Sequence, residues 1–217
     1  YEIGNIYLPK SLPLTELPDE KTMFTLGMYG HGDFFDMKGV CEEFFEKIGM
    51  KKKMQYDPAS EMTFLHPGRQ ANMVYEGTVV GYLGEVHPLV ADNYGIGDRA
   101  YIAMIDIKSV LGFANFNHKF TGIAKYPAVT RDISMLVPKQ ILAGQIEDIL
   151  VQRGGKILES YQLFDIYEGS QFKGGYKSMA YALVFRDHDK TLEESEISAA
   201  MKKILNGLEG LGIELRS

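Results

Sequence analysis

The sequence contains one cysteine and no tryptophan among its 217 residues. A single thiol, Cys41, allows no intramolecular disulfide and no multi-cysteine zinc site, so we expect a reducing, cytoplasmic compartment. No run of about 18 consecutive apolar residues occurs, which excludes a membrane-spanning helix. Basic residues are outnumbered, 23 against 29 acidic ones, and the net charge of −6 disfavours a protein that holds nucleic acid by bulk phosphate neutralisation.

Motifs for nucleotide binding and nucleophilic catalysis are also missing. The glycines between residues 27 and 39 form neither GxGxxG nor GxxxxGK[ST], so no phosphate-binding loop is predicted. There is no GxSxG elbow, and Cys41 is predicted on the buried face of a helix. The five histidines lack the i, i+4 spacing of a zinc helix. We therefore expect no metal, and we place His66-Pro67 and His87-Pro88 in loops at strand ends.

What the sequence does contain is ordinary globular composition, 45% hydrophobic and 24% charged. The length suits two domains, and the change from an apolar segment to mixed polar residues puts their junction near residue 120. Residues 123–217 carry 12 Lys and Arg against 13 Asp and Glu, and this near-neutral balance permits a module that reads a few unstacked bases. The chain begins at Tyr1 instead of methionine, so we expect a piece of a longer polypeptide.

Apolar periodicity in residues 123–217 predicts the order strand, helix, strand, strand, helix, strand. The second helix is expected to begin at a capping box formed by Thr191 and Glu194. This order is the ferredoxin-like βαββαβ pattern, in which both helices cover one face of a four-stranded antiparallel sheet. The expected strands are 131–137, 158–167, 178–186 and 213–216, and the expected helices are 141–153 and 191–209.

The pleat of these strands predicts which side chains lie on the open face of the sheet, because alternate residues point to opposite faces. The residues predicted beneath the helices are Ile133, Met135, Phe164, Ile166, Met179 and Tyr181. The residues predicted on the open face are Ser134, Asp165, Tyr167, Ser178 and Ala180. The open face should therefore be a small polar platform with one aromatic ring.

Residues 1–120 predict an antiparallel α+β region whose strand order the sequence does not indicate. A helix capped by Asp36 should end at Ile48, and Ser109 should cap a short helix. Glu76-Gly77 should connect a hairpin. The expected strands are 2–8, 23–30, 73–75, 79–83 and 100–107.

Eight segments, in order along nearly the whole chain, resemble the C-terminal part of the β subunit of bacterial phenylalanyl-tRNA synthetase. They are residues 33–39 (DFFDMKG), 65–71 (LHPGRQA), 84–88 (GEVHP), 126–132 (YPAVTRD), 163–169 (LFDIYEG), 177–180 (KSMA), Thr191-Leu192 and Leu215-Arg216.

The resemblance implies that residues 1–120 are the latter half of an inactive, catalytic-like class II synthetase domain. Residues 123–217 would be a ferredoxin-fold anticodon-binding domain. The implied parent enzyme is an α2β2 heterotetramer that charges tRNA(Phe) with phenylalanine. ATP and magnesium would be bound in the holoenzyme, with no cofactor, metal or catalytic residue in this chain. The implied partners are the α subunit and the tRNA(Phe) anticodon, without a membrane.

By motif position, the resemblance also implies contacts to the first anticodon base, a guanine, from Ser134, Asp165, Tyr167 and Ser178. Tyr167 would stack on the base, and Asp165 would accept hydrogen bonds from guanine N1–H and N2–H₂, donors that adenine does not present in this pattern. The two serines would offer hydroxyl groups.

Two other functions remain open from the sequence. A ferredoxin-fold sensor would bind a free amino acid, and calorimetric titration of the chain with phenylalanine would reveal it. A pure assembly scaffold would leave an anticodon stem-loop unprotected in footprinting.

Overall fold

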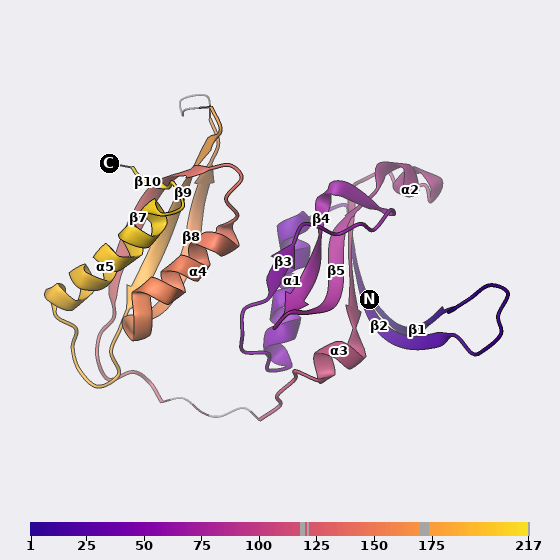
Figure 1. Ribbon diagram of the computed structural model, residues 1–217, viewed down its shortest axis with the longest axis horizontal. Helices are drawn as coiled ribbons and strands as arrows, with labels where there is room; N and C mark the ends of the chain where they lie inside the picture. The colour runs from indigo at the N-terminus through magenta and orange to yellow at the C-terminus, as the bar shows by residue number, and fades with distance from the viewer. Residues whose placement is uncertain (118–119, 121, 170–173, 217) are drawn as a thin grey trace. The chain divides into compact units, whose positions relative to one another are not determined.

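The computed structural model describes residues 1–117, 120, 122–169 and 174–216. The chain forms two compact units, Tyr1–Phe120 and Thr121–Ser217 (Figure 1). Each has its own apolar core, so the two units are described separately. No helix in the described part of the chain is long and apolar enough to cross a membrane.

The first unit is built on a six-stranded antiparallel sheet with the order β1-β2-β6-β5-β4-β3. Its strands are β1 (Glu2–Leu8), β2 (Asp19–Tyr29), β3 (Gln55–Asp57), β4 (Leu65–Tyr75), β5 (Thr78–Val86) and β6 (Ala100–Asp106). The predicted hairpin is confirmed: Glu76 and Gly77 join β4 to β5 with φ of 49° and 80°, as a two-residue turn with positive φ at both positions requires. The sequence did not predict β3.

Three helices accompany this sheet: α1 (Phe34–Lys47), α2 (Pro88–Asn93) and α3 (Ile107–Leu111). The prediction that Asp36 caps α1 is wrong. Asp33 is the N-cap, and its carboxylate accepts from the backbone N–H groups of Phe35 and Asp36, while the Asp36 carboxylate accepts from the backbone N–H of Asp33. Asp106, instead of Ser109, likewise caps α3. In both helices the N-cap is an aspartate three residues before the predicted one, directly before the first helical residue.

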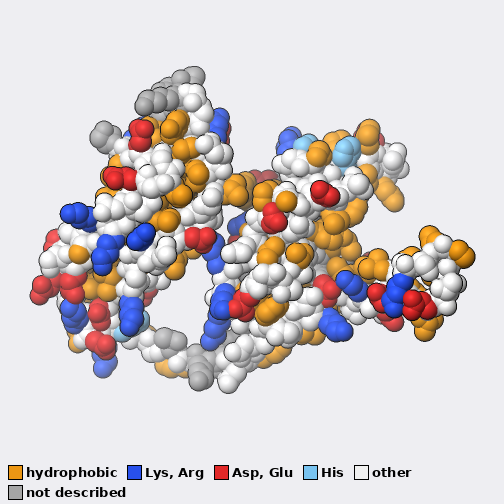
Figure 2. Space-filling model, in the orientation of Figure 1, with side chains coloured by type: hydrophobic (Ala, Val, Ile, Leu, Met, Phe, Trp, Pro, Cys, Tyr) orange, Lys and Arg blue, Asp and Glu red, His pale blue; other side chains and the backbone are white. Residues whose placement is uncertain are grey.

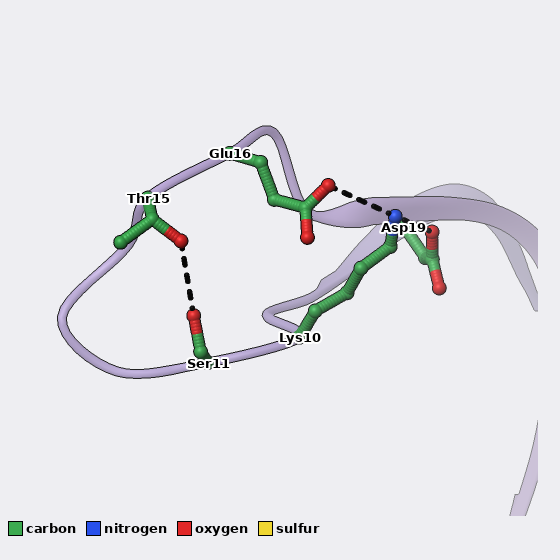
Figure 3. A network of polar contacts seen from close by, with 5 residues as sticks. All are labelled: Lys10, Ser11, Thr15, Glu16 and Asp19. Carbon is green, nitrogen blue, oxygen red and sulfur yellow. Dashed lines mark hydrogen bonds and ion pairs between the residues drawn. The ribbon is translucent and has the colours of Figure 1, made fainter.

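The connection between β1 and β2 is an exposed loop closed by polar contacts (Figure 3). Lys10 Nζ lies 3.3 Å from Glu16 Oε2 and 3.6 Å from Asp19 Oδ1, and the hydroxyls of Ser11 and Thr15 are 3.3 Å apart. Because these groups are exposed, each pair adds little stability. Figure 2 shows basic and acidic side chains interspersed over the face in view, as the mixed composition predicts.

The second unit has a four-stranded antiparallel sheet with the order β10-β7-β9-β8. Its elements are β7 (Val129–Pro138), α4 (Ala143–Gly154), η1 (Gly155–Ile157), β8 (Leu158–Tyr167), β9 (Tyr176–Phe185), α5 (Glu194–Glu209) and β10 (Glu214–Leu215). The predicted ferredoxin-like order is confirmed. Figure 1 shows α4 and α5 side by side on one face of the sheet.

The core of this unit lies between the sheet and the two helices. Ile146 and Leu150 of α4 meet Ile197, Ile204 and Leu208 of α5, and all five side chains are buried. The predicted capping box at Thr191 is wrong. α5 starts two residues after that box would place its first turn, with Glu193 as N-cap and the Glu196 carboxylate accepting from the Glu193 N–H. Leu192, just before the cap, is buried in the core.

Candidate nucleic-acid interface

The helix-free face of the second sheet carries all four residues that the sequence singled out. In the register of β7, β9 and β8, Ser134 lies opposite Ala180, and Ala180 lies opposite Asp165. One row along, Ser178 lies between Leu136 and Tyr167.

Facing residues of an antiparallel ladder share a face, and so do residues two apart on one strand. Met135, Met179 and Tyr181, which alternate with the residues of these rows, are buried in the core. Ser134, Asp165, Tyr167 and Ser178 therefore project from the opposite face.

A β-bulge at Phe164 sets the direction of Asp165. Leu163 pairs with Tyr181 on the helix side, and the next pair along the ladder is Asp165 with Ala180 on the open side. Without the extra residue, Asp165 would face Met179 and point toward the helices, since a one-residue slip exchanges the faces of a strand. The bulge thus turns a carboxylate outward at the end of β8.

Two core positions predicted on β8 are exposed in the structure. Phe164 and Ile166 were expected beneath the helices, but their side chains are 55% and 52% exposed. Tyr161 and Leu163 pack against the core in their place. Phe164 is the unpaired residue of the bulge, whereas Ile166 lies opposite the buried Met179 and is exposed one residue before the end of β8.

The four residues differ in accessibility. Asp165 is exposed, Tyr167 is 47% exposed, and Ser134 is half-buried. Ser178 is only 2% exposed, although the pleat assigns it to the open face. Its hydroxyl accepts a hydrogen bond from Arg216 Nη1 at 3.3 Å, so an arginine covers this serine. The Ser178 hydroxyl is thus engaged with Arg216 in this structure, and its contact with a base stays a prediction.

Small residues surround the ring of Tyr167 on this face of the sheet. A Cβ added to Gly169 would lie 2.5 Å from Tyr167 Cε1 and 2.7 Å from its hydroxyl oxygen. The ring therefore rests against the backbone at Gly169, which a larger residue would not permit. Ala180 and Ala182 of β9 project only methyl groups from this face, so β9 adds little side-chain bulk there.

Two lysines lie at the same end of the sheet. Lys139 Nζ lies 2.8 Å from Glu168 Oε2, and this hydrogen bond, together with the lysine charge, lowers the pKa of the Glu168 carboxyl below its usual value. Lys177 Nζ lies 3.5 Å from the carbonyl oxygen of Lys139. The negative charge of Glu168 is thus paired with a cation at this end of the sheet.

In the first unit, a cavity of roughly 290 Å³ lies beside the buried carboxylate of Glu85. Arg69 Nη1 donates to Glu85 Oε1 at 2.9 Å, and Arg99 Nε lies 4.0 Å from the same oxygen. Within the described residues, Glu85 Oε2 has no hydrogen-bond partner. The arginines hold the carboxylate in place, and the feature is an ion pair beside a cavity.

The remaining reactive groups have local structural roles. Burial, and then the charge of Glu42, raises the pKa of the Cys41 thiol from 9.0 to about 12, so it is not a nucleophile near neutral pH. His66 Nδ1 accepts from the backbone of Gly68, and His87 Nδ1 accepts from Leu89 at the start of α2. Among the residues that the structure describes, no group of three His, Cys, Asp or Glu side chains could hold a metal ion.

Sequence reasoning missed two contributors to this face, Arg216 and Gly169. Arg216 and Gly169 appeared only within segments of the resemblance, residues 215–216 and 163–169. Side chains alternate between the two faces of a strand, so the expected strand 213–216 places Arg216 on the same face as Glu214. This alternation was the signal in the sequence for Arg216. Its contact with Ser178 depends on strands that are distant in sequence.

Comparison with known families adds an independent finding. Residues 1–107 match the model described as "Phenylalanyl tRNA synthetase beta chain CLM domain", and residues 124–216 match "Ferredoxin-fold anticodon binding domain".

Three curated relatives illustrate the similarity, and all are phenylalanine–tRNA ligase β subunits. The one from Clostridium acetobutylicum is 43% identical over 100% of this chain, and the one from Clostridium tetani is 39% identical over 100%. The Bacillus subtilis subunit is 32% identical over 96% of this chain. The chain spans 27% of the length of each of these relatives.

A solved structure of pyrrolysyl-tRNA synthetase from Desulfitobacterium hafniense also matches, with a TM-score of 0.37 and 15% identity. It covers 50% of this chain and 38% of that one, and a similarity of this size carries no argument. The family models and the curated relatives agree with each other over nearly the whole sequence. The chain therefore belongs to the family of phenylalanine–tRNA ligase β subunits, and it corresponds to a part of such a subunit.

Proposed function

We propose that this chain is a non-catalytic part of a phenylalanine–tRNA ligase β subunit, and that residues 123–217 recognise the first anticodon base of tRNA(Phe), a guanine. One observation carries the proposal. A helix-free sheet face, within the residues that match an anticodon-binding domain, projects a carboxylate and a phenol ring from β8 and a serine from β7, with β9 between these two strands. RNA-binding proteins recognise unpaired bases on such surfaces by stacking and by hydrogen bonds to base edges.

The chemistry of each residue suits guanine. The half-exposed ring of Tyr167 offers a surface for stacking, worth about 1–3 kcal/mol per base. The exposed Asp165 carboxylate accepts from N1–H and N2–H₂ of guanine, whereas adenine presents an acceptor at N1 and lacks the N2 amino group. Ser134 contributes a hydroxyl beside the base. Ser178 acts indirectly, by accepting a hydrogen bond from Arg216, whose side chain covers it.

Residues 1–120 are proposed to pack against the α subunit as the latter half of a catalytic-like domain related to the class II synthetase core. The match of residues 1–107 to the β-chain family model supports this assignment. The single cysteine, Cys41, is buried on α1, where it packs in the core of the unit and is not available as a nucleophile. ATP and magnesium are then bound by the α subunit of an α2β2 heterotetramer in the cytoplasm.

The test uses the complete β subunit assembled with its α subunit. Asp165→Asn keeps the size of the side chain but replaces one acceptor oxygen with a donor. We expect the kcat/KM for aminoacylation of tRNA(Phe) to fall by about 10- to 100-fold, the range of a base-edge hydrogen-bond pair. Phenylalanine activation, measured as ATP–pyrophosphate exchange without tRNA, should be unchanged.

A matched control is Asp148→Asn on α4, an exposed carboxylate on the helix-covered side of the same unit. It should leave both reactions unchanged. Unaltered aminoacylation by Asp165→Asn would contradict the proposal. So would an equal loss in phenylalanine activation, because the defect would then lie outside anticodon recognition.

A further inference from the structure

Arg216 lies beside the proposed base-recognition face, directly after β10. Glu214 pairs with Leu136 and Leu215 with Met135, so the next position along the ladder is Arg216 opposite Ser134. The backbone confirms this register, because the Arg216 N–H donates to the carbonyl oxygen of Ser134 at 2.8 Å. Since Ser134 projects from the helix-free face, the side chain of Arg216 starts from that face too.

The direction of the Arg216 side chain is fixed by its contact with Ser178. Arg216 Nη1 lies 3.3 Å from Ser178 Oγ, and Ser178 belongs to β9, beyond the whole width of β7. The guanidinium group therefore crosses the open face and ends over the residue that pairs directly with Tyr167. A guanidinium carries five N–H donors, and the Ser178 hydroxyl accepts from one nitrogen.

Four residues that face one another on neighbouring strands form one row across the sheet, in the order Arg216, Ser134, Ala180 and Asp165. With strands about 4.8 Å apart, its ends are separated by about 14 Å between Cα atoms. A long cationic side chain reaches inward from one end and a short anionic side chain from the other. The two residues between them, Ser134 and Ala180, have small side chains, as a flat base bound over this row would require.

Guanine matches this arrangement in the order of its polar groups. N1–H and N2–H₂ are donors on one edge, and O6 and N7 are adjacent acceptors on the next. A carboxylate suits the first edge, and an arginine fork suits the second, which is the commonest specific contact to guanine in nucleic-acid recognition. Adenine presents an amino group in place of O6, so it would set donor against donor at the guanidinium.

We propose that Arg216 is a further specificity-determining residue, which donates hydrogen bonds to O6 and N7 of the anticodon guanine, with Ser178 as the positioning residue that holds its guanidinium over the sheet. This inference rests on the proposed function of the face. It adds recognition of the acceptor edge to the donor-edge recognition assigned to Asp165. Removing the arginine should therefore weaken discrimination between guanine and adenine as well as the use of tRNA(Phe).

The test changes one atom of the tRNA and one side chain of the protein. The complete α and β subunits are assayed with tRNA(Phe) that carries guanine or 7-deazaguanine at the first anticodon position, the latter lacking the N7 acceptor. With the unaltered enzyme, 7-deazaguanine should lower aminoacylation kcat/KM severalfold. Arg216→Gln should lower kcat/KM with guanine by about 10-fold or more and should be insensitive to 7-deazaguanine.

Two further variants sharpen the result. Arg216→Lys keeps the charge without the fork and should recover only part of the loss, because an ammonium group does not span O6 and N7 as the guanidinium does. Arg153→Gln, an exposed arginine of α4, is the matched control and should behave as the unaltered enzyme. Ser178→Ala should give a smaller defect than Arg216→Gln.

Each outcome decides between explanations. If Arg216→Gln keeps the full penalty for 7-deazaguanine, the guanidinium does not contact N7 and the inference is wrong. If Arg216→Gln loses the same factor with every base at this position, and Arg216→Lys restores it, the arginine binds a phosphate and the inference is again wrong. If the unaltered enzyme is indifferent to replacement of guanine by adenine, the proposed function itself fails.

Discussion

Gly169 lies against the aromatic ring of Tyr167, with the position of an added Cβ only 2.5 Å from the ring atom Cε1. Tyr167 is the last residue of β8 and Gly169 lies two residues further on, so their contact depends on how the chain leaves the sheet. The absence of a side chain at Gly169 is what lets the ring occupy its place. This relationship provides a way to displace the ring without altering it.

Gly169→Ala should push the Tyr167 ring from its position, because the clash is with the end of a side chain and is relieved by its rotation. We expect lower aminoacylation kcat/KM with tRNA(Phe) and unchanged phenylalanine activation in the complete enzyme. Gly174→Ala is the control, since a Cβ there would meet nothing within 4 Å. Equal behaviour of the two variants would show that the ring position is unimportant for tRNA use.

Tyr167 itself offers a pair of substitutions that separates the ring from the hydroxyl. Tyr167→Ala should lower kcat/KM for tRNA(Phe) by about 10-fold or more, from the loss of stacking worth ~1–3 kcal/mol. Tyr167→Phe keeps the ring and should stay close to the unaltered enzyme. A defect of similar size in both variants would mean that the hydroxyl group, and not stacking, makes the contribution.

Cys41 should react slowly with thiol reagents in the folded protein and quickly after unfolding, because its side chain is fully buried and its pKa is raised to about 12. The unfolded thiol releases its proton near pH 9, whereas the folded thiol keeps it. The thiol therefore contributes stability that is complete below pH 9 and is lost as the pH rises toward 12.

Urea unfolding of the chain at several pH values, compared with that of Cys41→Ala, measures this contribution. The free energy of unfolding should fall more steeply between pH 9 and pH 10 when Cys41 is present. Parallel curves for the two proteins would mean that the thiol does not titrate differently in the folded state.

The core of the second unit depends on α4, and two adjacent residues of this helix provide a matched pair. Leu150 is fully buried against the sheet, and Val151 is 55% exposed. Leu150→Ala should lower the free energy of unfolding of this unit by about 2–5 kcal/mol, through lost burial and the cavity left behind. Val151→Ala should change it by much less. Similar losses measured by urea unfolding would contradict the packing described here.

Periodicity was sufficient for the elements of the second unit, because strand and helix repeats of 2 and 3.6 residues are local properties of the chain. The helical repeat also accounts for the buried stripe of α5 formed by Ile197, Ile204 and Leu208. It misplaced the start of that helix. Thr191 and Glu194 have the right spacing for a capping box, but Glu193 is the N-cap, and Leu192, just before it, is buried in the core.

Contacts between strands decided the rest. Phe164 reads as a core residue by alternation, and only the register of β8 on β9 makes it the exposed residue of a bulge. Alternation by itself cannot reveal a bulge, because the extra residue is defined by its lack of a partner on the other strand. The sequence nonetheless assigned Asp165 and Tyr167 to the open face, which is where the bulged strand has them.

The sequence alone determined the family resemblance, the order of the elements in residues 123–217, and the set of polar side chains on one face of their sheet. Motifs and hydrophobic repeats are local properties of consecutive residues, so they can be recognised without the structure. The tertiary structure alone decided that Arg216 covers Ser178. These two residues are 38 positions apart, and they meet only because β10 pairs with β7 and a long side chain then crosses that strand.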